Sequence, residues 1–278
     1  MGYKIISDSS SDLLEMSGVP FSSVPLKIIT DEKEYVDDST LNVGDMVFDL
    51  QQYKGTSRSS CPNILDWKDS FENYEGIFCV TITSALSGSY NSANLAVQEY
   101  LSEFPNKKAV VLDTLSTGPE NALIIEKLQE LISENLPFEI IEEKIREYMK
   151  KTHLLFCLES MKNLANNGRV SKTVAKIAGI MGIRIIGKAS DIGTLEIVEK
   201  ARGAQKALND IYNNIIKNGY KGGKVRIHHC QNEDAANTLK QKINTIFPNA
   251  VIKINKTRAL CSFYAESGGL LVAFEETP

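Results

Sequence analysis

The feature that most constrains the fold is an alternation of strand-length apolar runs with helical segments, which continues as far as Lys150. Such runs occur at Lys4–Asp8, Gly76–Ile82 and Lys107–Thr114. The second and third runs are followed by segments in which apolar residues recur at helical spacing. Strands that are apolar on both faces and separated by helices are typical of a parallel sheet with helices on both faces.

After Lys151 the pattern changes to hairpins mixed with helices. Two extended segments flank Asp191–Gly193, a typical hairpin turn, and further strands and helices follow. We therefore predict a two-domain α/β fold, for which 278 residues suffice. Residues 1–150 form an N-terminal α/β domain with a mostly parallel sheet, and residues 151–278 form a C-terminal α+β domain with a mostly antiparallel sheet.

Composition excludes several classes of protein. A net charge of −4 argues against nucleic-acid binding. Five cysteines without a CxxC pair indicate a reduced, cytoplasmic protein. The longest apolar stretch is interrupted by Lys176 and Arg184, so we expect no stable membrane insertion.

Four segments are rich in hydroxyl side chains, and three of them directly follow predicted parallel strands. The segments are Ser7–Leu13, Gly55–Pro62, Thr81–Ser92 and Asp113–Gly118. Each alone is typical of a helix cap or a solvated turn. Because the carboxyl ends of parallel strands share one sheet edge, their convergence predicts an anion site there, at a helix N-terminus near Gly88.

The usual motifs for nucleotide binding, serine hydrolysis and metal binding are missing from the sequence. The sequence contains no Gly-rich phosphate loop and no GxSxG elbow, and its three histidines do not have metal-ligand spacing. We therefore predict no metal site, no cofactor and no catalytic residue. His228 and His229 are neighbours on a predicted strand, so we expect one imidazole in the core and the other outside.

Two arginines lie at junctions between predicted elements of the second half. Arg169 follows the end of a helix at Gly168, and Arg202 lies between a strand and a helix. Each is typical of a surface or ion-pair residue. At the seam between domains, each could instead bind an anion or a partner.

Taken in order, the motifs resemble those of the DegV family over essentially the whole chain. They are "DSSSDL", "TSRSS", "SALSGSYNSA", "DTLSTG", "NNGRVSK", "IGKASDIGTLEIVEKARGAQKAL" and "GGLLVAFE". The resemblance implies the two-domain fold called EDD and a carrier, not an enzyme, that binds one long-chain fatty acid in an apolar tunnel between the domains. It further implies that the carrier, like the B subunit of a fatty acid kinase, presents this ligand to a separate Dak-type kinase, which makes an acyl-phosphate.

The resemblance also implies roles for individual residues. Thr56 and Ser57 of the "TSRSS" segment and Ser87 of the "LSGSY" segment would bind the carboxylate, and Gly88 would keep its loop tight. Tyr264 stands near a histidine of the family's carboxylate network.

The resemblance assigns the two arginines to a different task. Arg202 matches an arginine that serves the kinase encounter or phosphate transfer, and Arg169 matches one near the surface of the second domain. We therefore expect both to contact the partner or a phosphate.

The chain departs from the family pattern at three places. Arg58 and Ser59 replace Gln and Pro in a "TSQPS" segment, Tyr264 replaces the histidine, and "NGRV" replaces "GGRI". A tyrosine hydroxyl can supply a hydrogen bond where the histidine supplied a nitrogen.

Two competing interpretations use the same hydroxyl-rich loop. One is a stand-alone small transferase, which needs a base beside Ser87, with Tyr264 and His229 as candidates. The other is a protein that binds a small phosphorylated anion, which predicts a short polar pocket.

Overall fold

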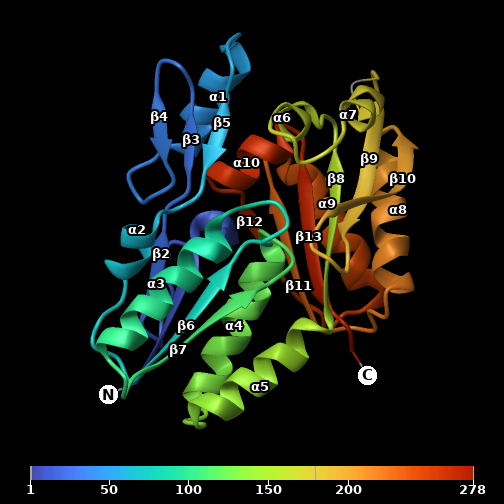
Figure 1. Cartoon of the computed structure of the whole chain (residues 1–278). Coiled ribbons are helices and arrows are strands. Elements are labelled where there is room, and N and C mark those ends of the chain that lie inside the picture. The colour runs from blue at the N-terminus through green and yellow to red at the C-terminus, as the bar shows by residue number, and fades with distance from the viewer. Residues whose placement is uncertain (1, 179, 278) are drawn as a thin grey trace.

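A computed structural model of the chain describes residues 2–178 and 180–277. The first half is built on four parallel strands in the order β2-β1-β6-β7 (Figure 1). The strands are β1 (Tyr3–Asp8), β2 (Phe21–Val24), β6 (Gly76–Thr81) and β7 (Lys108–Asp113). The predicted N-terminal parallel sheet is therefore confirmed.

Helices cover both faces of this sheet. They are α2 (Ile64–Lys68) and α3 (Ser89–Glu103) on one face, and α4 (Pro119–Ser133) and α5 (Phe138–Met149) on the other. Successive side chains of a strand point to opposite faces. Ile5 therefore packs in the cluster with α4 and α5, whereas Ile6 packs in the cluster with α2 and α3. This arrangement explains why the strands are apolar without alternation.

A separate small sheet lies between β2 and β6 in the sequence. Its antiparallel strands, in the order β4-β3-β5, are β3 (Lys27–Ile29), β4 (Glu34–Val36) and β5 (Arg58–Ser60). Helix α1 (Val43–Gln52) precedes β5 and lies beside this sheet (Figure 1). The "TSRSS" segment therefore contributes a strand, and this strand carries part of the site described below.

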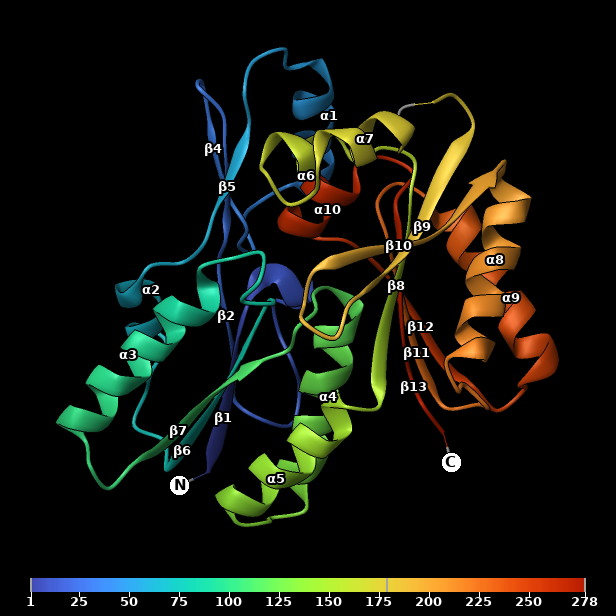
Figure 2. The ribbon, with the colours of Figure 1, turned by 45° about the vertical axis from the view of Figure 1, so that its right-hand side comes forward.

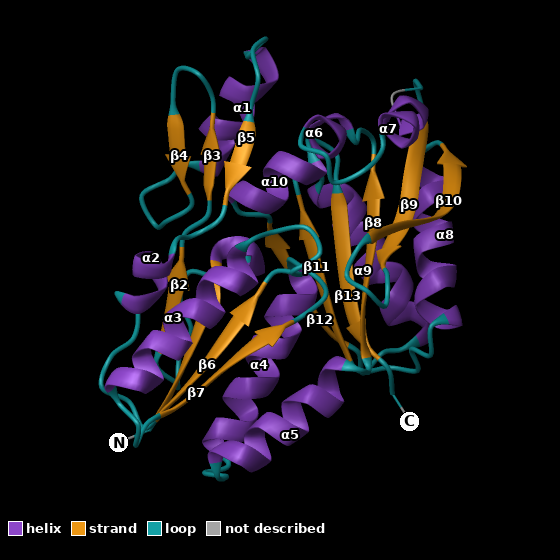
Figure 3. Cartoon of the chain, in the orientation of Figure 1, coloured by secondary structure: helices purple, strands orange, loops and turns teal. Residues whose placement is uncertain are grey.

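The second half is built on a sheet of six strands in the order β10-β9-β8-β13-β11-β12 (Figure 3). Their bounds are β8 (Thr152–Leu158), β9 (Ile183–Ala189), β10 (Leu195–Arg202), β11 (Lys224–His229), β12 (Val251–Lys256) and β13 (Leu270–Glu275). Among the described residues, only the β11–β12 pair of this sheet is parallel, which confirms the mostly antiparallel prediction. The predicted turn lies between β9 and β10, where Ser190 N donates to Thr194 O at 2.8 Å.

The remaining helices surround this second sheet. Two of them, α8 (Ala204–Lys217) and α9 (Glu233–Ile246), cover one face (Figure 2). Three short ones lie near one end of the strands: α6 (Lys162–Asn166), α7 (Lys172–Ala178) and α10 (Ala259–Ala265). A 3-10 turn, η1 (Ser9–Ser11), follows β1.

Helix α4 lies between the two sheets (Figure 2). It packs against β1 and β6 of the first sheet and against β8, β11 and β13 of the second. Glu126 of α4 binds Arg226 of β11 with both carboxylate oxygens, one of them 3.0 Å from Nε. Helix α4 is therefore packed between the two halves and contacts both sheets.

Asp12 also joins the halves. Its Oδ1 accepts from Arg258 N at 2.7 Å, and its Oδ2 lies 2.7 Å from His228 Nδ1. The expectation that one histidine faces outward is wrong, because His228 and His229 are both buried. One face of β11 meets the N-terminal half, and the other is covered by α9.

Candidate functional site

An apolar cavity of about 70 Å³ lies between the two halves. The N-terminal half contributes Ile82, Leu86 and Thr117, which follow β6 and β7. Strand β8 contributes one face, with Leu154, Phe156 and Leu158. Helix α10 and the residues around α6 complete the lining, with Leu164, Arg169, Leu260, Cys261, Tyr264 and Ala265 among them.

Polar side chains gather beside the cavity near the carboxyl end of β8. Tyr264 Oη and Ser59 Oγ lie 2.6 Å apart, and Arg169 Nε donates to Leu86 O at 3.2 Å. The guanidinium carbon of Arg169 lies 6.0 Å from the centre of the Tyr264 ring, a distance typical of a cation–π contact. A cation and a pair of hydroxyls therefore meet at one end of an apolar cavity.

Protonation makes Tyr264 a donor. Burial raises the pKa of the Tyr264 hydroxyl above its ordinary value, against the smaller effects of Ser59 and Arg169. The group therefore stays neutral near pH 7 and offers a proton to an acceptor. Arg169 donates to two backbone carbonyls, of Leu86 and Asn167, and a guanidinium has five N–H groups. Both side chains suit a carboxylate or a phosphate.

The predicted carboxylate loop lies next to the "TSRSS" segment. Ser87 is half-buried, and its Oγ accepts from Ser89 N at 3.3 Å, at the start of α3. A side chain at Gly88 would approach Cys61 Sγ to 3.1 Å, so glycine lets the two segments pack closely. Neither residue is among those that line the apolar cavity.

The "TSRSS" segment meets the cavity through Ser59. Thr56 is exposed, and Ser57 is half-buried with its carbonyl accepting from Asn167 Nδ2 at 3.2 Å. Ser59, two residues further on, is the member that reaches Tyr264. Ser59 and Tyr264 are also two of the positions at which the chain departs from the family pattern, so the two departures contact each other.

The two arginines lie in different surroundings. Arg169 lines the cavity, although its motif suggested a position near the domain surface. Arg202 is exposed at the end of β10 and does not line the cavity. Of the two arginines, only Arg202 is exposed, so only Arg202 is accessible to a partner.

Most hydroxyls that follow the parallel strands bind the protein's own groups. Buried Asp8 accepts from Ser89 Oγ at 2.6 Å, from Ile82 N at 3.0 Å and from Ser10. Burial raises the pKa of Asp8, and these hydrogen bonds oppose that rise. Ser10 O in turn accepts from Gly118 N at 2.8 Å. The predicted convergence of three segments is confirmed, but the Ser10 and Ser89 hydroxyls bind this internal carboxyl group, and others, such as those of Thr83 and Thr114, bind backbone carbonyls.

The base that a transferase would need is missing beside Ser87 in the part of the chain that the structure describes. His229 lines a different cavity, with Asn42 and Lys256, and its Nδ1 accepts from Asn232 N at 3.1 Å. Tyr264 lies at the apolar cavity, but its raised pKa makes it a poor base near pH 7.

Among the described residues, no cluster of His, Cys, Asp or Glu could hold a metal ion. No helix within residues 2–178 and 180–277 is both long and apolar enough to cross a bilayer.

Sequence reasoning missed the association of Ser59, Arg169 and Tyr264. The three residues come from β5, from the loop after α6 and from α10, so no spacing rule connects them. The available signal was the pair of departures from the family pattern at Ser59 and Tyr264. The structure shows that these two residues touch.

Comparison with known proteins identifies the family. The family described as "Uncharacterised protein, DegV family" matches residues 3–277. A DegV domain-containing protein of Streptococcus pneumoniae is 43% identical over 279 residues, covering 99% of each chain.

Solved structures agree with this match. The Streptococcus pneumoniae Fatty Acid Kinase (Fak) B3 protein, loaded with linoleic acid, is 43% identical, with a TM-score of 0.98 and 100% of both chains covered. A DegV family protein from Eubacterium eligens, loaded with heptadecanoic acid, is 42% identical, with a TM-score of 0.97, covering 99% of this chain and 100% of the other. The chain belongs to the DegV family.

Proposed function

We propose that the protein binds one long-chain fatty acid, with the tail in the apolar cavity and the carboxylate beside Arg169, Tyr264 and Ser59. The observation that carries this proposal is an almost wholly apolar cavity at whose edge Arg169, Tyr264 and Ser59 lie together. An amphipathic ligand with one anionic group matches that arrangement. A small phosphorylated anion would leave the apolar part of the cavity unused.

The tail supplies most of the affinity. At ~0.8 kcal/mol per methylene, a saturated tail of palmitic acid gains roughly 12 kcal/mol on transfer from water, before the costs of association. The head group adds less free energy, but it fixes the direction in which the ligand lies.

The carboxylate would be bound by a charge and by neutral donors together. Arg169 supplies the charge, and Tyr264 supplies a hydroxyl proton. Ser87 and Gly88 lie at the start of α3, where backbone N–H groups favour an anion. We assign Thr56 and Ser57 to the entrance, where Thr56 is exposed to an incoming head group.

We further propose that the protein is a carrier without its own catalysis or cofactor, and that it presents the fatty acid to a Dak-type kinase in the cytoplasm. Support comes from the similarity to the protein named Fatty Acid Kinase B3. The five cysteines are all free, which suits a reducing compartment. Exposed Arg202 is the residue we assign to the kinase or the phosphate.

Native mass spectrometry of the purified protein, followed by solvent extraction, tests the proposal. We expect one fatty acid per chain, and a delipidated sample should take up added palmitate at the same ratio. An empty protein that also fails to take up added palmitate would overturn the proposal.

A kinase assay tests the carrier role separately. Acyl-phosphate formed only when a purified Dak-type kinase and ATP are added would support this role, and acyl-phosphate formed by this protein alone would contradict it.

A further inference from the structure

The apolar cavity has a direction, which strand β8 defines. Leu154 and Leu158 lie on the same face of β8, four residues apart, so their Cα atoms are separated by roughly 13 Å. The carboxyl end of β8 leads to α6 and Arg169, which places Leu158 near the polar end. Leu154 therefore lies at the far end, where the tail of a bound fatty acid would finish.

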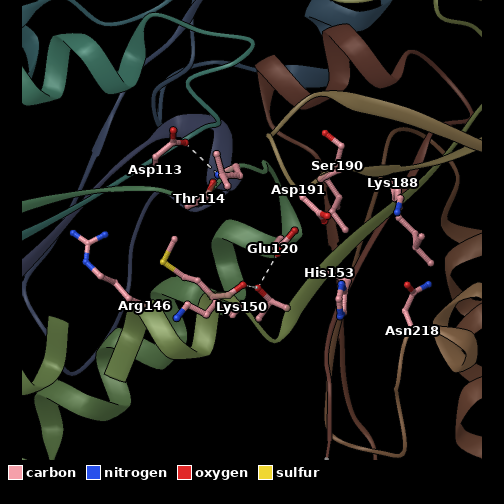
Figure 4. A pocket seen from close by; sticks show the side chains of 16 residues that line it. Asp113, Thr114, Glu120, Arg146, Lys150, His153, Lys188, Ser190, Asp191 and Asn218 are labelled. Atoms are coloured by element: carbon pink, nitrogen blue, oxygen red, sulfur yellow. Dashed lines mark hydrogen bonds between the residues drawn. The ribbon is translucent and has the colours of Figure 1, made fainter. Parts of the chain in front are cut away.

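A second and larger cavity begins on the other side of Leu154. It has a volume of about 510 Å³ and lies between α4, α5, β8 and the β9–β10 hairpin (Figure 4). Leu154 lines both cavities. The paired residues Ala189 and Leu195 divide in the same way: Ala189 lines the larger cavity, and Leu195 lines the apolar one. These three residues form a partition between the two spaces.

The larger cavity has a mixed lining, in which Leu115, Met149 and Leu155 stand beside charged groups. Its walls carry the charged side chains of Asp113, Glu120, Arg146, Lys150, Lys188 and Asp191 (Figure 4). Glu120 is buried, and its carboxylate accepts from Thr152 Oγ1 at 2.7 Å. A methyl end that crossed the partition would leave an almost wholly apolar lining for a mixed one and gain less.

This larger cavity is also not built to bind an anion. Its basic side chains already have carboxylate partners within 4 Å: Arg146 with Glu142, Lys150 with Glu147, Lys188 with Glu196 and His153 with Glu276. The larger cavity is therefore a space of mixed polarity behind the acyl site and not a second binding site for a charged ligand.

We propose that Leu154, supported by Leu195 and Ala189, is the end wall of the acyl site and sets the longest chain that the protein binds well. This inference rests on the proposed fatty-acid binding. Each methylene on the apolar side strengthens binding by about fourfold. The gain stops at Leu154, so affinity should rise with chain length up to that wall and then level off or fall.

Substitutions of opposite size test the wall. Delipidated wild type, Leu154→Ala and Leu154→Phe are compared for affinity across saturated acids from lauric to arachidic acid. Leu154→Ala should move the optimum to a longer acid and favour the longer acids by about tenfold relative to wild type, and Leu154→Phe should move it to a shorter acid. Leu158→Ala is the matched control, because it has the same burial and strand face but lies at the polar end. It should weaken all acids without moving the optimum.

The outcomes separate this inference from the proposed function. Wild type that binds none of the acids refutes fatty-acid binding itself. Wild type that binds, with the same optimum in both Leu154 variants, overturns the wall, as does a wild-type affinity that still rises through arachidic acid. Melting temperatures establish that each variant is folded. If Leu154→Ala does not fold, half-buried Leu195 provides the test, and Leu195→Ala must shift the optimum to longer acids for the wall to stand.

Discussion

At the scale of single residues, the candidate site combines an arginine that matches the family pattern with a serine and a tyrosine that do not. Arg169 belongs to the family's "GGRI"-like motif, whereas Ser59 and Tyr264 are departures from the family pattern that meet at 2.6 Å. A tyrosine hydroxyl paired with a serine can replace a histidine nitrogen as a neutral donor. Exchange of one partner without the other would leave a partly buried hydroxyl without its hydrogen bond.

The charge on Arg169 should matter for acids and not for neutral lipids. We expect Arg169→Gln to weaken binding of palmitate roughly ten- to hundredfold, because a hydrogen bond to a charged group contributes ~1.5–3 kcal/mol. Binding of hexadecanol, which has the same tail and no charge, should change little. Equilibrium binding of both ligands measures the difference.

Arg184→Gln is the control for this prediction, because Arg184 pairs with Glu159 and does not line the apolar cavity. It should leave both affinities unchanged. Equal losses for palmitate and hexadecanol in Arg169→Gln would mean that Arg169 supports the loop and not the carboxylate.

At the scale of elements, the β9–β10 hairpin connects the two halves. The carbonyl of its turn residue Gly193 accepts a hydrogen bond from Thr83 Oγ1 at 2.9 Å, and its strand residue Leu195 lines the apolar cavity. Gly193 has a φ of +76°, and a side chain there would lie 2.1 Å from Thr83 Oγ1. The hairpin can therefore dock only with glycine at its turn.

Gly193→Ala should lower the melting temperature more than Gly182→Ala does. Gly182 has nearly the same φ, +77°, but nothing lies within 4 Å of the added carbon. Both variants lose about 1–2 kcal/mol to the left-handed backbone, and only Gly193→Ala also displaces the hairpin from Thr83. Thermal unfolding and the rate of fatty-acid loss should both show the difference, and equal melting temperatures would contradict the docking role.

The elements themselves differ in how well the sequence predicts them. Strands β1, β6 and β7 were predictable because each is a run of six residues rich in apolar side chains. Strand β5 was not, because the Ser-rich segment Gly55–Pro62 is typical of a solvated turn and a strand of three residues is too short to show a period. The placement of Arg169 depends on how the loop after α6 packs across the cavity, and local sequence does not record such long-range packing.

At the scale of the whole molecule, α4 holds the halves together as a helix with two packed faces. Glu126, 17% exposed, neutralises Arg226, which is only 2% exposed. Ion pairs this buried matter mainly when they are broken, because the remaining charge has lost its solvent and its partner.

Glu126→Gln should therefore destabilise the protein by ~3 kcal/mol, since it leaves the Arg226 guanidinium buried without a countercharge. Glu130→Gln on the same helix is the control. Glu130 pairs with Lys224, but its side chain is 43% exposed, so we expect less than ~1 kcal/mol. Urea unfolding monitored by circular dichroism gives both values, and similar small losses would show that Arg226 finds a substitute partner.

The shared helix also affects the order in which the molecule can form on the ribosome. Residues emerge in sequence, so the parallel strands and α4 are available first. β8 can cover part of the second face of α4 early, but the rest stays uncovered until β11 has been made, a hundred residues after Glu126. The sheet that covers it also needs β13, which is synthesised after β12 yet lies between β8 and β11. A nascent chain of this protein must therefore carry an incompletely covered α4, with Glu126 still lacking Arg226, until β11 has been made, and the two halves reach their final packing together.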